Sequence, residues 1–455
     1  MKNRDIHTGL TALGASLFAS LPAWAQDAAA TTTEAVAEVA AEVVPVMDKG
    51  DVSWMMTSTV LVLFMTIPGL ALFYGGLVRS KNMLSVLMQT TVIACVMMIV
   101  WVIYGYSFAF GGSTSPWWGG TAKMFLSGIT ADSMAATFSA GYVIPEHLFV
   151  AFQMTFAAIT PALIIGAFAE RVKFVSVLLF SVLWGTFSYF PIAHMVWDAN
   201  GYLFAKGAID FAGGTVVHIN AGIAALVGCI VIGHRVGYGK DNMAPHSMVM
   251  TMIGASMLWV GWFGFNVGSN LEANGGATLA MINTFIATAA ATLTWSALEG
   301  LQRGKASMLG AASGMVAGLV AITPACGTLG PMGSILLGAI AAAGCYFFVT
   351  VVKNALKYDD TLDVFGIHGI GGIIGALLTA VFSAASFGGV KGDDYAMMSQ
   401  LWIQAEGVLI TIVWSGVVSF VLFKLIDLTI GLRVDADSER QGLDLVSHGE
   451  QAYHS

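Results

Sequence analysis

The chain has 455 residues, of which 57% are hydrophobic and only 10% are charged, and its formal net charge is -8. Soluble globular domains carry about 25% charged residues, so this composition excludes a soluble protein and indicates a polytopic membrane protein. The acidic residues lie mostly in tails and loops, and nothing in the composition supports binding to nucleic acid.

The first segment has the features of a cleavable secretory signal. Lys2 and Arg4 precede an apolar run, and Ala23-Trp24-Ala25 follows it as a small-x-small cleavage site. We therefore predict a signal peptide over residues 1–25, which places the mature N-terminus outside. Residues 26–50 contain mostly Ala, Thr, Glu and Val with few bulky apolar side chains, so we predict a polar outer linker there.

Eleven apolar segments come next, and each is long enough to cross a bilayer core of about 30 Å. We therefore predict an all-α membrane protein with an eleven-span domain over residues 51–430 and a cytoplasmic tail over residues 431–455. The segments are 52–74, 84–110, 148–169, 174–195, 215–232, 247–267, 277–298, 308–323, 335–352, 364–382 and 401–430.

The distribution of Lys and Arg supports this topology. With an outside N-terminus and eleven spans, thirteen of these residues lie in cytoplasmic segments and four lie outside. An excess of Lys and Arg in cytoplasmic loops is expected for a correctly oriented membrane protein. The pattern predicts a multi-pass membrane protein with a cytoplasmic C-terminus.

Eleven spans divide into five, five and one, and an odd number per repeat inverts the second five relative to the first. This inverted-repeat plan places binding sites near the membrane midplane, between the two halves. His218 lies in the fifth span of the first half, and His368 lies in the fifth span of the second. Helical rise puts them roughly 12 and 8 Å from opposite faces, so we predict that the two imidazoles meet.

Ionisable side chains inside a spanning segment are costly, which makes the two histidines candidates for a functional site. The alternative is a pair of hydrogen-bonded core histidines. Asp210 and Asp363 precede the same two spans. We expect both acids to have a structural role as caps of helix N-termini, with Asp210 also shaping the outer vestibule.

Several ordered motifs resemble those of the ammonium transporter family (Amt/Mep/Rh), specifically its bacterial Amt branch. The resemblance covers essentially the whole mature chain and implies a homotrimer of eleven-helix protomers, each with its own pore. The motifs are residues 68–76 (PGLALFYGG), 166–171 (GAFAER), 194–197 (HMVW), 210–222 (DFAGGTVVHINAG), 261–266 (GWFGFN), 323–326 (TPAC), 363–375 (DVFGIHGIGGIIG) and the tail at 442–450 (GLDLVSHGE).

The resemblance also implies roles for single residues. By this resemblance, Phe156, Trp197 and Ser269 match the family's outer substrate-binding site. Phe156 and Phe265 match its aromatic pore gate, and His218 and His368 match its pore histidines. An aromatic face attracts a small cation by roughly 0.5 to 2 kcal/mol, and a serine hydroxyl accepts a hydrogen bond. The structural alternatives are a membrane-interface anchor for Trp197 and helix packing for the two phenylalanines.

The functional prediction is transport of ammonium or ammonia, with methylammonium as a further candidate substrate. No nucleophile motif or phosphate loop occurs, so we expect no enzyme activity, no cofactor and no metal site. The resemblance implies a P-II type regulatory protein as a partner at the cytoplasmic face. Two alternatives stay open: an ammonium sensor that signals through its tail, and an Rh-like conduit for the neutral gas.

Overall fold

The computed structural model describes residues 45–453, so the predicted signal peptide and most of the predicted outer linker lie outside the described residues. The chain divides into two units: residues 1–46 with 139–142, and residues 47–138 with 143–455. The second unit holds every described helix and therefore contains the membrane-spanning segments. Its first helix begins at Lys49, inside the segment predicted as linker.

The described part of the chain is dominated by α-helices, several of which continue through a short π-helical or 3-10 segment (labelled η). The first half contains α3 (Lys49–Phe64), η1 (Met65–Leu70), α4 (Ala71–Leu77), η2 (Ser80–Asn82), α5 (Met83–Val100), η3 (Trp101–Gly105), α6 (Tyr106–Phe110), η4 (Met124–Leu126), α7 (Glu146–Ile164), η5 (Ile165–Ala167), α8 (Phe174–Trp184), η6 (Gly185–Tyr189), α9 (Phe190–Trp197), α10 (Tyr202–Ala205), η7 (Gly214–Ile219) and α11 (Asn220–Ile232).

The second half contains α12 (Met248–Gly268), α13 (Gly275–Arg303), α14 (Met308–Ile322), α15 (Pro331–Phe347), η8 (Phe348–Val352), α16 (Lys353–Leu356), η9 (Phe365–Gly369), α17 (Ile370–Phe382), η10 (Ala385–Phe387), α18 (Met397–Thr429), α19 (Ala436–Gln441) and η11 (Asp444–His448). The short strands are β1 (Val46–Met47), β2 (Met134–Ala136) and β3 (Tyr142–Pro145). The antiparallel β2–β3 pair lies in the connection between α6 and α7, for which no strand was predicted.

The prediction of an all-α membrane protein is confirmed. Among residues 45–453, ten helical stretches are long and apolar enough to span a bilayer. The eighth predicted span, residues 308–323, corresponds to α14, a shorter apolar helix of 15 residues that does not reach that length. It ends one residue before Thr323, where the chain turns toward α15.

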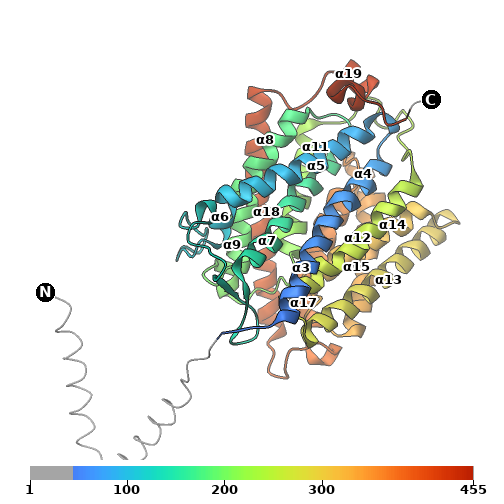
Figure 1. The fold of residues 1–455 in the computed structure, drawn as a ribbon. Helices are drawn as coiled ribbons and strands as arrows, with labels where there is room; N and C mark the ends of the chain where they lie inside the picture. Colours follow the sequence, from blue (N-terminus) through green and yellow to red (C-terminus); the bar gives the residue numbers. More distant parts are fainter. Residues whose placement is uncertain (1–44, 454–455) are drawn as a thin grey trace, which may run out of the picture. The chain divides into compact units, whose positions relative to one another are not determined.

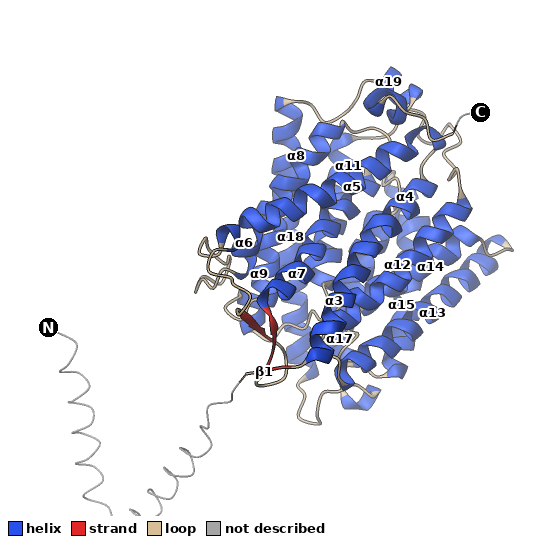
Figure 2. Ribbon diagram, in the orientation of Figure 1, coloured by secondary structure: helices blue, strands red, loops and turns tan. Residues whose placement is uncertain are grey.

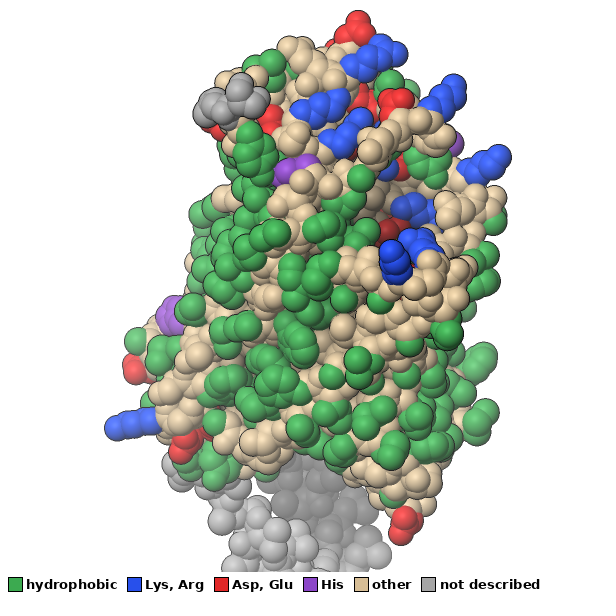
Figure 3. Space-filling model, turned by 90° about the vertical axis from the view of Figure 1, so that its right-hand side faces the viewer, with side chains coloured by type: hydrophobic (Ala, Val, Ile, Leu, Met, Phe, Trp, Pro, Cys, Tyr) green, Lys and Arg blue, Asp and Glu red, His purple; other side chains and the backbone are tan. Residues whose placement is uncertain are grey.

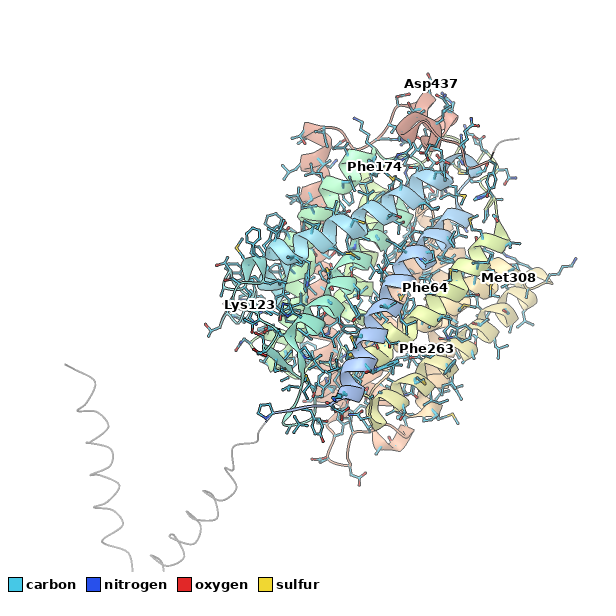
Figure 4. All side chains as sticks on the ribbon, viewed as in Figure 1. Phe64, Lys123, Phe174, Phe263, Met308 and Asp437 are labelled. Atoms are coloured by element: carbon cyan, nitrogen blue, oxygen red, sulfur yellow. The ribbon has the colours of Figure 1, made fainter. Side chains whose placement is uncertain are left out.

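The helices of the second unit form a bundle, with α19 at one end and the β2–β3 pair near the other (Figures 1 and 2). Hydrophobic side chains cover the middle of the face in Figure 3, and Lys and Arg gather toward the α19 end. Figure 4 places Asp437 at that end and Lys123 near the other, and it labels Phe64 and Met308, which line an apolar surface hollow of about 570 Å³.

Close packing between α3 and α12 fixes the part of α12 that matters for the site. A Cβ added to Gly261 would lie 2.4 Å from the Met65 Cβ, and one added to Gly264 would lie 2.5 Å from the Leu61 Cβ. Such contacts are far inside van der Waals distance, so only glycine allows this approach. The glycines therefore set the position of Phe265, which lies between them and the end of α12.

A cluster of ion pairs joins the loops at the α19 end. Glu170 pairs with Arg79 at 2.7 Å and with Arg235 at 3.3 Å, and Arg235 also pairs with Asp359 at 2.8 Å. Burial alone would raise the pKa of Glu170, but hydrogen bonds and charge from Arg79 and Arg235 outweigh burial and hold that pKa below its ordinary value. The charged Glu170 carboxylate therefore stabilises the folded state.

This cluster predicts a pH-dependent stability. Because the pKa of Glu170 is lower in the folded state, its contribution is present above pH 4.5 and is lost as the pH falls through the folded pKa. Removing one partner of a buried ion pair costs about 3–5 kcal/mol. We expect Glu170→Gln to lower the thermal midpoint in detergent at pH 7 and to weaken the acid dependence below pH 4.5.

The matched control is Glu406→Gln, which makes the same change of charge at an exposed pair with Lys206. Exposed ion pairs contribute about 0–1 kcal/mol, so the thermal midpoint of this variant should stay close to that of the unmodified chain. Equal losses in the two variants would contradict the stabilising role of Glu170.

Candidate functional site

Two phenylalanine rings stack at one end of the candidate path. Phe156 on α7 and Phe265 on α12 have ring centroids 4.1 Å apart and an interplanar angle of 24°. Both side chains are buried, with 1% and 0% of their surface exposed. The two residues were predicted to lie together as a gate, and the structure brings the two rings into direct contact.

Trp197, at the C-terminal end of α9, packs against the same stack. Its ring meets Phe156 edge-on, at 5.9 Å between centroids and an angle of 87°. Its indole N–H donates a hydrogen bond to the Asp210 carbonyl at 2.9 Å, which fixes the orientation of the ring. Trp197 is therefore held by the protein next to the phenylalanine stack, and its side chain remains partly exposed.

Ser269 follows Phe265 by one helical turn, as the C-cap residue of α12. Its hydroxyl donates a hydrogen bond to the Phe265 carbonyl at 2.7 Å. Because the single hydroxyl hydrogen is used in that bond, the oxygen presents its lone pairs to a donor. The Ser269 oxygen can therefore accept a hydrogen bond from an N–H group of the substrate, as the predicted outer site requires.

His218 in η7 and His368 in η9 lie side by side. Their Nδ1 atoms are 3.1 Å apart, and their ring planes are tilted by 24°. His218 is fully buried and His368 is 4% exposed. The predicted contact between the two imidazoles, 150 residues apart in the chain, is present.

The hydrogen bond between the two Nδ1 atoms determines which of the two Nε2 atoms carries a hydrogen. In a neutral pair, one ring donates from Nδ1 and carries a bare Nε2, while the other accepts at Nδ1 and carries Nε2–H. The pair therefore offers one acceptor and one donor. Among the described residues, the buried His218 Nε2 has no hydrogen-bond partner, which leaves it free for a small polar molecule.

Aromatic rings connect the histidine pair to the phenylalanine stack. The Phe265 centroid is 5.9 Å from that of His218. Trp262, one turn before Phe265 on α12, lies nearly parallel to His218 at 5.4 Å and 19°. Trp262 was not among the predicted site residues, because a tryptophan in an apolar run usually indicates packing or an interface anchor.

Two glycines, one on α11 and one on α17, allow the two spans that carry the histidines to approach closely. A Cβ on Gly222 would lie 2.3 Å from the Gly369 backbone nitrogen, and a Cβ on Gly372 would lie 3.2 Å from the His218 Cβ. Each glycine follows its own histidine by four residues and faces the other segment. The repeated spacing His-x-x-x-Gly is a sequence signal that could have predicted this inverted crossing.

The two segments begin with acids that cap their backbones. Asp210 accepts hydrogen bonds from four successive amides, those of residues 213–216, at 2.6–3.0 Å. The expected counterpart was Asp363, but Asp360 accepts from the amides of Val364 and Phe365. Asp363 has φ +60°, and its carboxylate pairs with Lys353 at 2.6 Å, so the capping prediction for Asp363 is wrong.

Comparison with known proteins agrees with the motifs. The sequence profile of the Ammonium Transporter Family matches residues 53–453. An ammonium transporter of Aquifex aeolicus is 47% identical over 90% of this chain and 94% of its own length. An ammonium transporter of Bacillus subtilis is 46% identical over 90% of this chain and 99% of its own length.

Solved structures give the same result. The crystal structure of Candida albicans Mep2 superimposes with a TM-score of 0.79 at 34% identity, over 90% of this chain and 91% of that one. A protein described as a sensor Amt protein superimposes with a TM-score of 0.80 at 28% identity, over 88% and 98% of the two chains. The protein is thus a multi-pass membrane protein that belongs to the ammonium transporter family.

Proposed function

We propose that this protein conducts ammonium or ammonia across the membrane along a path from Trp197, past the Phe156–Phe265 stack, to the histidine pair. The observation that carries the proposal is the direct contact of His218 with His368, next to Phe265. The contact pairs two buried imidazoles at the place where two inverted spans cross.

The outer step is binding of the cation. Moving a monovalent cation out of water costs several kcal/mol, and no single side chain at the outer end offsets that cost. The Trp197 face, the Phe156 ring and the Ser269 oxygen together provide a weak, small binding site. A compact cation with N–H donors satisfies all three, whereas a hydrated metal cation would lose its water at the stacked rings.

The inner step takes place at the histidines. The cation passes its proton to the imidazoles, which relay it onward, so the nitrogen crosses the apolar segment as neutral ammonia while one positive charge still crosses the membrane. The bare Nε2 of one ring accepts from ammonia, and the Nε2–H of the other donates to it. The pair can therefore hold the molecule and hold or pass its proton.

The proposal also covers the orientation of the protein in the membrane, its oligomeric state and its regulation. Lys and Arg gather at the α19 end in Figure 3, which supports a cytoplasmic position for the C-terminal tail and an outside position for the β2–β3 pair. Family resemblance supports a homotrimer in a bacterial inner membrane and a P-II type regulator that binds the cytoplasmic face. The family is one of transporters, which supports a role other than catalysis.

A sensor that signals through its tail is the second candidate, because a structural neighbour is described as a sensor Amt protein. The distinguishing experiment reconstitutes the full chain in proteoliposomes on a solid-supported membrane and adds ammonium. We expect a transient current that saturates with ammonium concentration. Tight binding without current would favour the sensor, and electrically silent uptake would favour an Rh-like gas conduit.

The outer site gives a prediction for Trp197. A cation–π contact contributes roughly 0.5–2 kcal/mol, so Trp197→Leu should raise the half-saturating ammonium concentration about 2- to 30-fold. The maximal current should change little, because the histidine pair is untouched. Trp118→Leu is the control: it removes a 40% exposed tryptophan that packs on Phe108 and leaves the stack intact. A half-saturating concentration unchanged in Trp197→Leu would contradict the outer site.

A further inference from the structure

A chain of hydrogen bonds begins at Trp262, next to the histidine pair. Trp262, whose ring packs flat on His218, donates from its indole N–H to the Thr323 hydroxyl oxygen at 2.9 Å. Thr323 comes directly after the end of α14 and begins the motif at 323–326. The indole of Trp262 is thus tied to a different helix from its own.

The Thr323 hydroxyl is itself held by hydrogen bonds. It has one hydrogen, and two acceptors lie near it: the Leu319 carbonyl at 2.8 Å and the Asn266 Oδ1 at 3.2 Å. Asn266 donates from Nδ2 to the Thr284 hydroxyl at 3.1 Å, which donates to a backbone carbonyl of α13. The chain therefore joins α12, α13 and α14 beside the His218 ring.

Every member of this chain is buried: Trp262 is 1% exposed, and Thr323, Asn266 and Thr284 are 0% exposed. Polar groups at this depth are costly unless they are paired, and a fully paired buried network fixes the orientation of its members. Apolar side chains of similar size could pack here, but they would leave the indole N–H without an acceptor and the ring free to tilt.

We propose that Thr323 and Asn266 are positioning residues that hold the Trp262 ring flat against His218 and so set the width of the passage at the histidine pair. Neither residue contacts the substrate. Asn266 also follows Phe265 directly, so its two hydrogen bonds hold the backbone that carries the gate ring. The inference rests on the proposed transport function, and it assigns a role to Asn266 in the motif at 261–266 and to Thr323 in the motif at 323–326.

Thr323→Val is the decisive variant, because valine has nearly the same shape and lacks the acceptor. The Trp262 ring should then sample tilted positions and widen the passage beside His218. We expect the ratio of maximal methylammonium current to maximal ammonium current to rise about fivefold, as for the loss of a typical hydrogen bond. Thr323→Ser keeps the hydroxyl and should restore the ratio of the unmodified chain.

The ratio is measured in proteoliposomes on a solid-supported membrane and does not depend on how much protein is incorporated. The control is Thr411→Val, which removes a buried hydroxyl bonded to the Gly407 carbonyl on α18 and should leave the ratio unchanged. If Thr323→Val does not fold, Thr323→Ala supplies the same loss of acceptor. An unchanged ratio in the folded Thr323 variant, or the same rise in Thr411→Val, would overturn the proposal.

A second readout is independent of transport. In protein labelled with ¹⁵N at tryptophan indoles, the signal that disappears in Trp262→Phe reports on Trp262. We expect its N–H to exchange with solvent faster in Thr323→Val than in Thr323→Ser, and equal exchange would overturn the proposal. Absence of ammonium current in the unmodified chain would instead contradict the proposed function and would leave this indole measurement as the test of positioning.

Discussion

Gly222→Ala is expected to abolish most transport, because the new methyl group would occupy the space of the opposite backbone. The added Cβ would lie 2.3 Å from the Gly369 nitrogen and 2.4 Å from the Gly369 Cα. Real Cβ atoms essentially never approach other atoms to less than 3.0 Å, so α11, which carries Gly222, must move away from η9. Any such movement separates His218 from His368, because both rings lie next to this crossing.

Two further variants make this prediction quantitative. Gly372→Ala meets its nearest neighbour, the Ile219 Cγ1, at 2.9 Å, so a smaller shift relieves it. Gly416→Ala on α18 meets its nearest neighbour, the Ile223 Cγ2, at 3.6 Å, which is ordinary contact. Overpacking costs about 1–3 kcal/mol. The thermal midpoint and the ammonium current should therefore be highest in Gly416→Ala, lower in Gly372→Ala and lowest in Gly222→Ala. A Gly222→Ala variant with the current of Gly416→Ala would contradict the crossing geometry.

Removing either imidazole is the second change with a large expected effect. His218→Ala deletes one member of the hydrogen bond that orients the pair, and it exposes the His368 ring to the vacated space. While the pair holds the relayed proton its hydrogen bonds involve a charged group, and such bonds contribute about 1.5–3 kcal/mol, which corresponds to a loss of about 10- to 150-fold in rate. We expect that loss in the maximal ammonium current of His218→Ala and of His368→Ala.

The comparison that isolates the pair uses His194→Ala. His194 is also fully buried, but its ring nitrogens contact the carbonyls of Ala109, in α6, and Ser115, in the loop that follows α6, and neither contact involves the crossing. Its loss should lower the thermal midpoint and leave the current per folded protein near that of the unmodified chain. Currents reduced equally in all three variants would show that the loss reflects general destabilisation.

The sequence was sufficient to predict the fold class and the histidine contact, because both follow from strong physical constraints. Apolar segments of membrane length must be helical, and an odd number of spans per repeat inverts the second half. His218 and His368 then fall at equivalent depths from opposite faces. The bounds of α14 were also predicted to within one residue, as 308–323 against Met308–Ile322.

Details that depend on side-chain direction could not be predicted. Asp360 and Asp363 both precede the span of His368, and only the backbone at Asp363, with φ +60°, decides which carboxylate reaches the helix amides. The role of Trp262 also depends on where its side chain points, so it could not be predicted. Its partner Thr323 is 61 residues away in the chain, and no local pattern links an indole to a hydroxyl at that separation.

The most direct test of the central claim compares the two single histidine variants with the double variant His218→Ala/His368→Ala. Groups that act as one unit lose their full effect when either is removed. Peak ammonium currents at equal incorporated protein should therefore be reduced similarly in all three variants. Losses that multiply in the double variant would show two independent residues, and currents equal to those of the unmodified chain would show that the path does not pass the histidines.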